Sequence, residues 1–180
     1  MLDLGCGECR LLQLLVQDST FHEIVGLDVS PAALKRAEKR LHLDRLPSSH
    51  AGRLRLLHGS LTYRDRRLQG YDAAAIVEVL EHLDRSRLAS FERVVFEFTR
   101  PPLVIVTTPN VESNPRFVGL ADGRLRNPDH RFEWTRNEFS AWAHDVSLRF
   151  GYQVRIEGVG PTDPLVGSPT QMGVFMRNGS

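Results

Sequence analysis

Short apolar runs alternate with longer amphipathic segments along the chain, and this order predicts strands that alternate with helices. The runs that read as strands span residues 1–4, 23–29, 53–58, 71–79 and 103–107. Apolar residues at helical spacing fall in residues 11–15, 32–43, 85–98 and 135–150. Repeated strand–helix–strand units indicate an α/β fold, with a mainly parallel sheet covered by helices on both faces.

Local signals place several element boundaries. Ser30 and Pro31 form an N-cap followed by proline at the first helical position, and Thr135 with Glu138 has the spacing of a capping box. Residues 152–159 and 171–177 alternate in polarity and predict a closing pair of strands. Residues 109–130 are rich in proline, glycine and polar side chains, and predict a long loop of the kind that often serves function.

Length and charge limit the classes of protein to consider. The chain has 180 residues, of which 23 are basic and 22 acidic, so a strongly basic, sequence-blind nucleic-acid binder is disfavoured. Two cysteines cannot build a disulfide framework, and we see neither a membrane-spanning run nor a signal peptide, so we expect a cytoplasmic protein. We expect one domain over residues 1–180. Its first strand starts at residue 1 and looks truncated, as in a fragment of a longer protein without its amino-terminal part.

A glycine-rich turn follows the first strand. Asp3, Gly5 and Gly7 form Asp-x-Gly-x-Gly, but Arg10 stands where a dinucleotide-binding loop needs its third glycine. An acid at the end of the second strand, Asp28, could bond both hydroxyls of a ribose. This pattern resembles the S-adenosylmethionine site of class I methyltransferases. On that resemblance Asp3, Gly5 and Gly7 surround the amino-acid end of the cofactor, Asp28 holds the ribose, and Ser60 and Leu61 flank the adenine.

Two other interpretations of this turn have less support. It could be a plain strand–turn–helix corner, although the two aspartates favour a ligand site. Cys6 and Cys9 match Cys-x-x-Cys, but zinc would require a second pair, and a redox pair would interrupt a glycine turn that has a better explanation. We therefore interpret both cysteines as small residues of the loop.

A second constellation follows the fourth predicted strand. Glu78, Glu81 and His82 stand at i, i+3 and i+4, which on a helical turn places two carboxylates and an imidazole on one face. Such a group can bind a divalent metal, and it can equally be a solvated helix start with acids near the positive end. The long loop leaves the carboxyl end of the neighbouring strand, and His130 lies at the end of this loop. His130 could therefore complete a site of two glutamates and two histidines.

Five segments of the chain together resemble the RNA 3′-terminal ribose 2′-O-methyltransferases, which act on small RNAs or repaired RNA ends. They are DLGCGE, EVLEHLD, TTPNVESNP, DHRFEWTRNEF and TQMGVF. The resemblance implies a class I, Rossmann-like fold with a seven-stranded sheet and a carboxy-terminal antiparallel pair. It also implies that Glu78, Glu81, His82 and His130 bind a metal and carry catalysis.

The expected reaction moves a methyl group from S-adenosylmethionine to a 2′-hydroxyl, a weak acid that needs activation. The only lysines, Lys35 and Lys39, lie on the helix after Asp28, and arginine does not deprotonate. A metal ion is the available activator, and by binding the 2′- and 3′-oxygens together it would select an RNA 3′ end. We expect Mn²⁺, with Mg²⁺ or Co²⁺ possible, and leave open which histidine accepts a proton.

The polar residues of the long loop are expected to contact the terminal nucleotides of RNA. They are Asn110, Asn114, Arg116, Arg124 and Arg126. Two alternatives remain open: a metal-assisted O-methyltransferase for catechols or quinone precursors, and a non-catalytic binding module. The resemblance further implies an RNA kinase–phosphatase–ligase as partner in a bacterial repair complex, and no membrane association.

Overall fold

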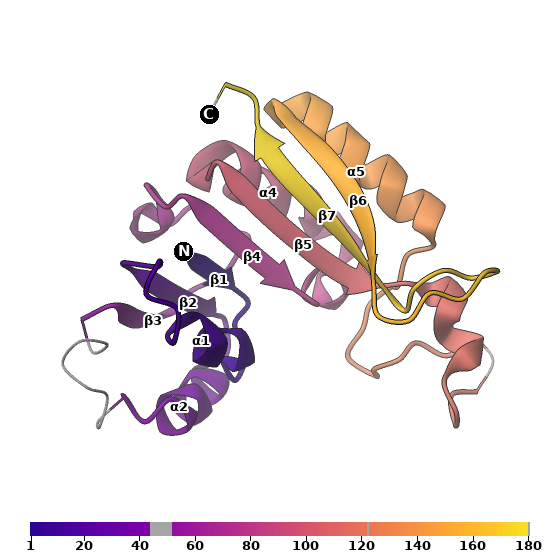
Figure 1. The fold of residues 1–180 in the computed structure, drawn as a ribbon, viewed down its shortest axis with the longest axis horizontal. Coiled ribbons are helices and arrows are strands. Elements are labelled where there is room, and N and C mark those ends of the chain that lie inside the picture. Colours follow the sequence, from indigo (N-terminus) through magenta and orange to yellow (C-terminus); the bar gives the residue numbers. More distant parts are fainter. Residues whose placement is uncertain (44–51, 122, 180) are drawn as a thin grey trace.

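A computed structural model describes residues 1–43, 52–121 and 123–179, which form one seven-stranded sheet flanked by helices (Figure 1). Five strands come from the first two thirds of the chain and two from its end. Their bounds are β1 (Leu2–Leu4), β2 (Ile24–Asp28), β3 (Leu54–His58), β4 (Ala73–Val77), β5 (Leu103–Pro109), β6 (Tyr152–Val159) and β7 (Thr170–Arg177). All seven predicted strands are therefore present, within about two residues of their predicted ends.

The sheet order is β3-β2-β1-β4-β5-β7-β6. The first five strands run parallel, and β7 lies antiparallel between β5 and β6. The order reverses between β1 and β4, and ligands of open α/β sheets bind at such a point, beside the carboxyl ends of the strands. The predicted mainly parallel seven-stranded sheet is confirmed, including its closing antiparallel pair.

Helices connect the strands and carry the predicted caps. The main ones are α1 (Arg10–Leu15), α2 (Pro31–Arg40), α4 (Leu88–Glu92) and α5 (Arg136–Phe150). The Ser30 hydroxyl accepts a hydrogen bond from the N–H of Ala33 at the start of α2. The capping box of Thr135 and Glu138 starts α5. Capping residues therefore predicted these helix starts correctly, because each satisfies backbone N–H groups that the helix itself leaves unpaired.

The single helix expected over residues 85–98 differs from the observed structure. It is a 3₁₀ turn, η4 (Arg85–Arg87), followed by α4 and by seven residues of π-helix, η5 (Arg93–Thr99). The N–H of Arg100 closes the last wide turn on the carbonyl of Val95 at 2.8 Å. Over seven residues, an apolar pattern cannot distinguish π spacing from α spacing, so the sequence predicted only that a helix exists here.

The long loop predicted for residues 109–130 is partly ordered into secondary structure. Pro109 ends β5, and residues 111–116 form a 3₁₀ helix, η6 (Val111–Arg116). The Asn110 side chain accepts from the N–H of Glu112 and so caps η6. Two further 3₁₀ turns are η2 (Arg66–Leu68) and η3 (Leu80–His82).

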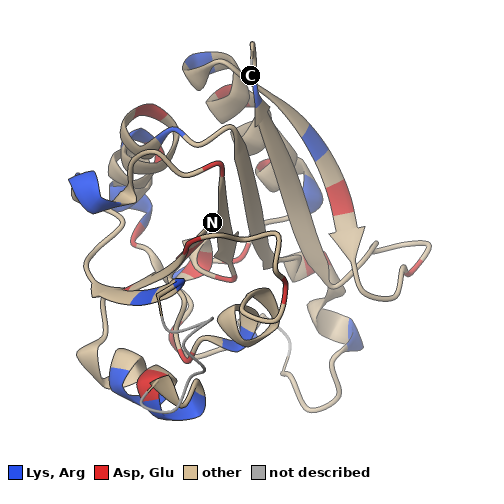
Figure 2. Cartoon of the chain, turned by 60° about the vertical axis from the view of Figure 1, so that its left-hand side comes forward, with Lys and Arg blue, Asp and Glu red and all other residues tan. Residues whose placement is uncertain are grey.

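Two apolar cores lie on opposite faces of the sheet. Adjacent residues of β2 enter different cores: Ile24 packs with α1 and α2, while Val25 packs with the larger core that includes the aromatic rings of α4, η5 and α5. Figure 2 shows lysine and arginine mainly on the outer helices and loops, with the central strands mostly tan. Among the described residues, no helix is both long and apolar enough to cross a membrane.

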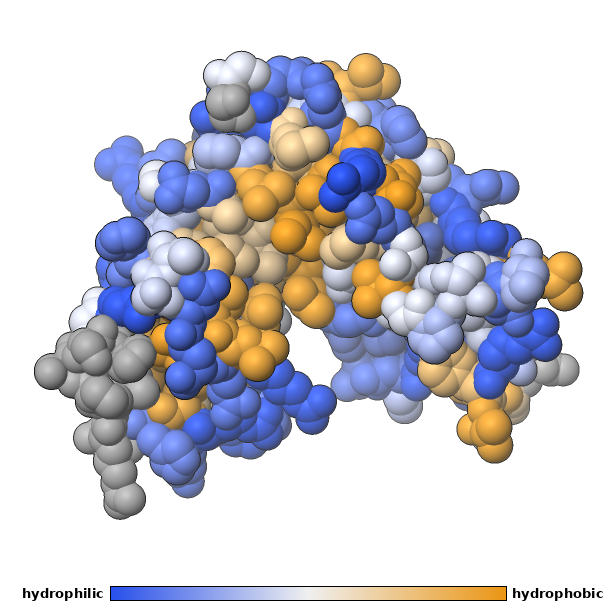
Figure 3. All heavy atoms as spheres, in the orientation of Figure 1, coloured by the Kyte–Doolittle hydropathy of each residue, from blue (hydrophilic) through white to orange (hydrophobic). Residues whose placement is uncertain are grey.

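One face of β4, β5 and β7 is left open. Val77 is 43% exposed and Met176 is 47% exposed, and Ile105 and Val174 are only partly buried. Figure 3 shows this apolar area across the middle of the visible face, bordered by hydrophilic residues. The helices α4 and α5 lie behind these strands in the same orientation (Figure 1).

Candidate active site

The glycine turn after β1 brings the ends of three strands together. Gly5 has φ of +82°, and a Cβ atom there would lie 2.5 Å from Cγ2 of Val79, so a larger residue would collide with the end of β4. Gly7 has φ of +52°, and its N–H donates to Oδ2 of Asp28 at 2.8 Å. The other oxygen of Asp28 accepts from the N–H of Ser30 at 2.7 Å. The carboxylate of Asp28 thus joins the turn to the end of β2.

A cavity of about 460 Å³ opens beside this turn. It contains five of the six residues predicted to bind the cofactor, and extends from them to the end of β4. These are Gly5, Gly7, Asp28, Ser60 and Leu61, and the remaining wall includes Val29, Gly59, Thr62, Glu78, Val79, His82, Leu83, Asp84 and Arg87. The cavity lies where the strand order reverses, the position at which open α/β sheets bind ligands.

The sixth predicted residue, Asp3, is almost fully buried and does not line the cavity. Burial, and after it the negative charge of Asp28, raise the pKa of Asp3 to about 7. Cys6 and Cys9 are buried free thiols that pack in the core with α1 and α2. Their packing agrees with the interpretation of both as small loop residues.

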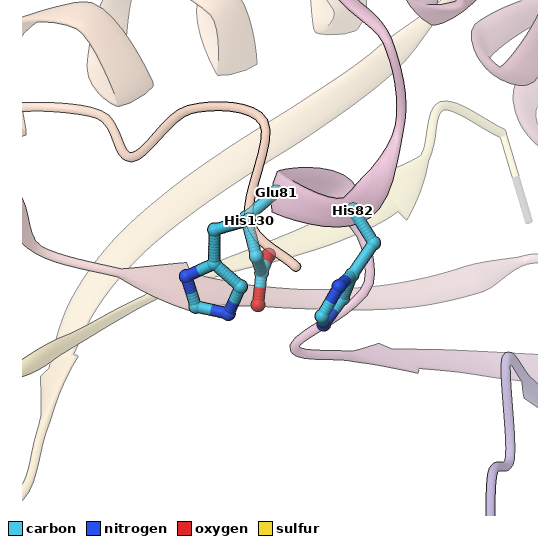
Figure 4. A group of neighbouring side chains, drawn as sticks. All are labelled: Glu81, His82 and His130. Atoms are coloured by element: carbon cyan, nitrogen blue, oxygen red, sulfur yellow. The ribbon is translucent and has the colours of Figure 1, made fainter. Parts of the chain in front are cut away.

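Glu81, His82 and His130 gather at the other end of the cavity. One ligand atom from each lies within 4.8 Å of the others, and the two imidazoles meet edge to face with ring centres 4.8 Å apart. Figure 4 shows the three side chains turned toward one another, His130 from the returning loop and the other two from η3. Of the four predicted metal ligands, the structure therefore brings three together.

Backbone and hydroxyl contacts fix this cluster. The N–H of Arg131 donates to the carbonyl of Glu81 at 2.6 Å, which ties the returning loop to η3. Thr108, at the end of β5, donates its hydroxyl to Oε2 of Glu81 at 2.9 Å. Among the described residues, the buried Oε1 of Glu81 has no hydrogen-bond partner. Burial raises the pKa of Glu81 to about 8, and the charge of Glu78 adds to this shift.

Glu78 lies at the edge of the cluster rather than within it. Its carboxylate accepts a hydrogen bond from the Thr107 hydroxyl at 3.1 Å, and burial raises its pKa. Its backbone has φ of +54°, an uncommon conformation for a residue with a side chain, held by its N–H bonding to Thr107. Glu78 also lines the cavity, so it stands between the cofactor end and the cluster.

The donor set fits a divalent metal ion. A buried carboxylate oxygen without a partner costs free energy, and a cation is a partner that would satisfy it. Burial, and then the charge of His130, lower the pKa of His82, which favours the neutral imidazole that a metal needs. Glu81, His82 and His130 are the residues that would hold the ion, with Glu78 adjacent.

Three of the five loop residues that were predicted to contact RNA make hydrogen bonds within the protein. Asn110 is fully buried, and its amide donates to the carbonyls of Val166 and Ser168. Asn114 is buried too, and the guanidinium of Arg126 donates hydrogen bonds to neighbouring main-chain and side-chain oxygens. Their groups are therefore already bonded within the protein.

The other two loop residues are exposed. Arg124 lies at the surface, and Arg116 pairs with Asp163 at 3.0 Å with about half of its side chain exposed. These two side chains are accessible to a ligand, and their predicted contact with RNA remains a prediction.

Sequence reasoning missed the residues that support the cluster. Thr107 and Thr108 bond the two glutamates, and Glu133 bonds His130 at 2.6 Å. All three stand in the segments TTPNVESNP and DHRFEWTRNEF, but spacing alone gives no reason to assign them. Glu133 follows His130 by three residues, which is the one signal that could have indicated a contact.

Comparison with known proteins identifies the family. A model of the methyltransferase domain matches residues 2–101 of the chain. The chain belongs to the methyltransferase domain family. The crystal structure of the methyltransferase domain of bacterial CtHen1 is 53% identical, with a TM-score of 0.89, and covers 97% of this chain and 88% of that one. This likeness confirms the predicted resemblance.

Two other relatives extend the comparison. The small RNA 2′-O-methyltransferase of Rattus norvegicus is 41% identical over 185 residues, covering 98% of this methyltransferase chain and 46% of the relative. The chain thus spans about half the length of that curated relative. A chain in the structure of the Pnkp1/Rnl/Hen1 RNA repair complex has a TM-score of 0.72, covers 98% of this chain and 37% of that one, and is 21% identical, a likeness of fold alone.

Proposed function

We propose that this methyltransferase moves a methyl group from S-adenosylmethionine to the 2′-hydroxyl of the 3′-terminal ribose of RNA, with one divalent metal ion. The observation that carries the proposal is the continuity of the site. One cavity extends from the glycine turn and Asp28 to Glu78 and His82, beside Glu81 and His130. The similarity to small RNA 2′-O-methyltransferases supports RNA as the acceptor.

The cofactor half of the site offers groups suited to an adenosine with a charged amino-acid end. Asp28 accepts two backbone N–H groups and lines the cavity, and a carboxylate has further lone pairs with which it could accept from ribose hydroxyls. Ser60 and Leu61 form the adenine wall in this proposal. Gly5 and Gly7 line the part of the cavity that takes the amino-acid end in this proposal, whereas Asp3 is buried and does not line it.

The acceptor half must activate and orient a hydroxyl. Lys35 and Lys39 both lie on α2 and neither lines the cavity, so neither is placed to act as a base there. His82 and His130 offer ring nitrogens as ligands, and Glu81 offers an oxygen that has no hydrogen-bond partner among the described residues. A divalent ion held there would supply Lewis-acid activation of a ribose hydroxyl.

The donor set also favours particular metals. Mg²⁺ prefers oxygen ligands and several waters, whereas two imidazole nitrogens with carboxylates suit Mn²⁺ or Co²⁺. We therefore propose Mn²⁺ first and Co²⁺ next. The proposed partner is an RNA kinase–phosphatase–ligase, by analogy with the Pnkp1/Rnl/Hen1 complex, and co-elution of the two proteins in gel filtration would test it.

Transfer of a labelled methyl group from S-adenosylmethionine tests the function directly. We expect transfer to RNA that ends in a 2′,3′-diol, loss with chelator, and best recovery with Mn²⁺ or Co²⁺. Alanine at Glu78, Glu81, His82 or His130 should remove most transfer while leaving cofactor binding, measured by calorimetry, nearly intact. Normal turnover by His130→Ala would contradict the four-ligand site. Transfer to catechols but not RNA would favour the small-molecule enzyme, and binding without transfer would favour a binding module.

A further inference from the structure

Glu133 is a buried carboxylate that the proposed reaction does not yet use. Its side chain has no exposed surface, and Oε1 lies 2.6 Å from Nδ1 of His130. The same oxygen accepts from the N–H of Arg126 at 2.7 Å, and Oε2 accepts from the side-chain amide of Asn114 at 2.6 Å. A buried carboxylate is tolerated when donors surround it, and Glu133 has three partners.

These contacts determine which nitrogen of the His130 ring carries a hydrogen. An ionised carboxylate only accepts hydrogen bonds, so the ring nitrogen that faces it, Nδ1, must carry the hydrogen. In a neutral imidazole the other nitrogen, Nε2, then has a free lone pair. Figure 4 shows one ring nitrogen of His130 on the side of Glu81 and His82 and the other turned away from them. Since Nδ1 faces Glu133, the nitrogen on the cluster side is Nε2.

The same carboxylate is itself held in place by the segment that returns to the cluster. Asn114 accepts from Nε of Arg126 at 2.8 Å while donating to Glu133, so the three residues form a closed set of contacts. The guanidinium of Arg126 also bonds the Ser113 hydroxyl and the carbonyl of Pro169, just before β7. Glu133 is therefore fixed relative to η6 and the start of β7, and it orients the His130 ring against these elements.

We propose that Glu133 is a positioning residue that fixes His130 as its Nδ1–H tautomer, with Nε2 presented to a divalent cation at the cluster with Glu81 and His82. The inference rests on the proposed function in one respect, since it takes His130 as a metal ligand. An outer carboxylate of this kind orients a histidine ligand and increases its basicity, and its loss typically weakens metal binding about 10–100-fold.

The tautomer can be measured without metal, RNA or any change to Glu133. We would label the histidine nitrogens of the chain with ¹⁵N and record their NMR shifts at pH 8, assigning His130 by its absence in the spectrum of His130→Asn. We expect a protonated Nδ1 and a bare Nε2. A His130 ring with its proton on Nε2 would overturn the proposal. This result does not depend on whether the protein methylates RNA.

The second measurement is the affinity for Mn²⁺ alone, by calorimetry. Glu133→Gln removes the charge and turns an amide donor toward Asn114 or Arg126, so we expect Mn²⁺ binding about 10–100-fold weaker and unchanged S-adenosylmethionine binding. Glu112→Gln is the matched control, because Glu112 is a more exposed glutamate of η6 that pairs with Arg136 outside the cluster.

Each outcome has a distinct meaning. Equal Mn²⁺ affinity in Glu133→Gln and the wild type, with both folded by thermal unfolding, would overturn the positioning role. If the Glu133→Gln variant does not fold, the wild-type tautomer decides the question. If the wild type binds no Mn²⁺, the proposed metal site is wrong, whereas the tautomer still reports on the contact between Glu133 and His130.

Discussion

Asp3 and Asp28 lie on neighbouring strands and differ in how the protein solvates them. Asp28 lines the cavity and accepts two backbone N–H groups, whereas Asp3 is buried, does not line the cavity, and has a pKa raised to about 7. A carboxyl group that is buried beside a like charge is destabilised in its charged form. The two residues therefore affect binding and stability differently.

Asp28→Ala should weaken S-adenosylmethionine binding by about 1–3 kcal/mol, the range for hydrogen bonds to a charged group. The expected cause is the loss of an acceptor for the ribose hydroxyls. Calorimetry measures the affinity, and Asp18→Ala serves as control, because Asp18 is an exposed acid that bonds Thr20 away from the cavity. An unchanged affinity in Asp28→Ala would mean that Asp28 does not hold the ribose.

Asp3→Asn should make the free protein more stable at neutral pH. The folded pKa of Asp3 is about 7 and the unfolded value is about 3.9, so both states are protonated below pH 4 and the substitution changes little there. As pH rises from 4 to 7, the unfolded chain ionises first and unfolding becomes easier in the wild type. Above pH 7 the difference is constant, and at most about 4 kcal/mol at roughly 1.4 kcal/mol per pKa unit.

Urea unfolding at pH 4 and pH 8 measures this difference in the free energy of unfolding. The variant should gain over the wild type only at the higher pH. A gain of the same size at both pH values would show that the substitution acts through packing or hydrogen bonding, not through ionisation of Asp3.

At the scale of elements, the end of β4 carries strain at a position that faces the cavity. Glu78 adopts φ of +54° directly after the strand, where a side chain is crowded by its own backbone. Strained backbone of this kind persists when surrounding contacts over-determine it, here the bonds of its N–H to Thr107. The sequence showed the carboxylate but not this conformation, because nothing in the residue type of Glu78 favours it.

Replacing Glu78 by glycine and by alanine separates the strain from the carboxylate. Both variants lose the side chain, yet Glu78→Gly should be about 1 kcal/mol more stable than Glu78→Ala, since glycine adopts positive φ without cost. At Gln153, an exposed residue of β6, the alanine variant should be more stable than the glycine variant, because glycine weakens a strand. Denaturant unfolding of the four variants gives both differences. A more stable alanine at position 78 would contradict the strained conformation.

The elements themselves were predictable where local chemistry specifies them. Ser30 and Thr135 mark helix starts because their hydroxyls satisfy backbone N–H groups nearby in sequence. The roles of Asn110 and Arg126 were not predictable, because their partners Val166, Ser168 and Pro169 lie about 40 to 60 residues away. Polar loop residues look alike in sequence whether they bind a ligand or bind one another, and only the fold distinguishes them.

At the scale of the molecule, the site draws on three segments that lie far apart in the sequence. The glycine turn and Asp28 come from the first 30 residues, the glutamates from the end of β4, and His130 from the chain that returns after β5. The topology places them together because the parallel strands end at one edge of the sheet. That part of the site followed from the sequence, since the strands and a mainly parallel sheet were predicted.

The proposed acceptor site should select the chemistry of an RNA end over its sequence. If both the 2′- and 3′-hydroxyls must be held, removing either should cost about 100-fold in rate, the scale for a misaligned nucleophile. We expect methylation of RNA with a free 3′ end, and none of 3′-deoxy, 3′-phosphate or all-DNA ends. Single-turnover transfer to matched oligonucleotides with different terminal bases is the control. Efficient methylation of a 3′-phosphorylated or internal ribose would contradict this selection.

The open face of β4, β5 and β7 also affects how the chain behaves at high concentration. Contiguous apolar surface on water-exposed strands attracts other apolar surfaces, including a second molecule. Val77 and Met176 lie on that face, and the side chain of Met176 belongs to neither described core. A charged residue at Met176 would therefore improve colloidal stability during concentration, and lower the binding of an apolar dye, without touching the cavity or the cluster.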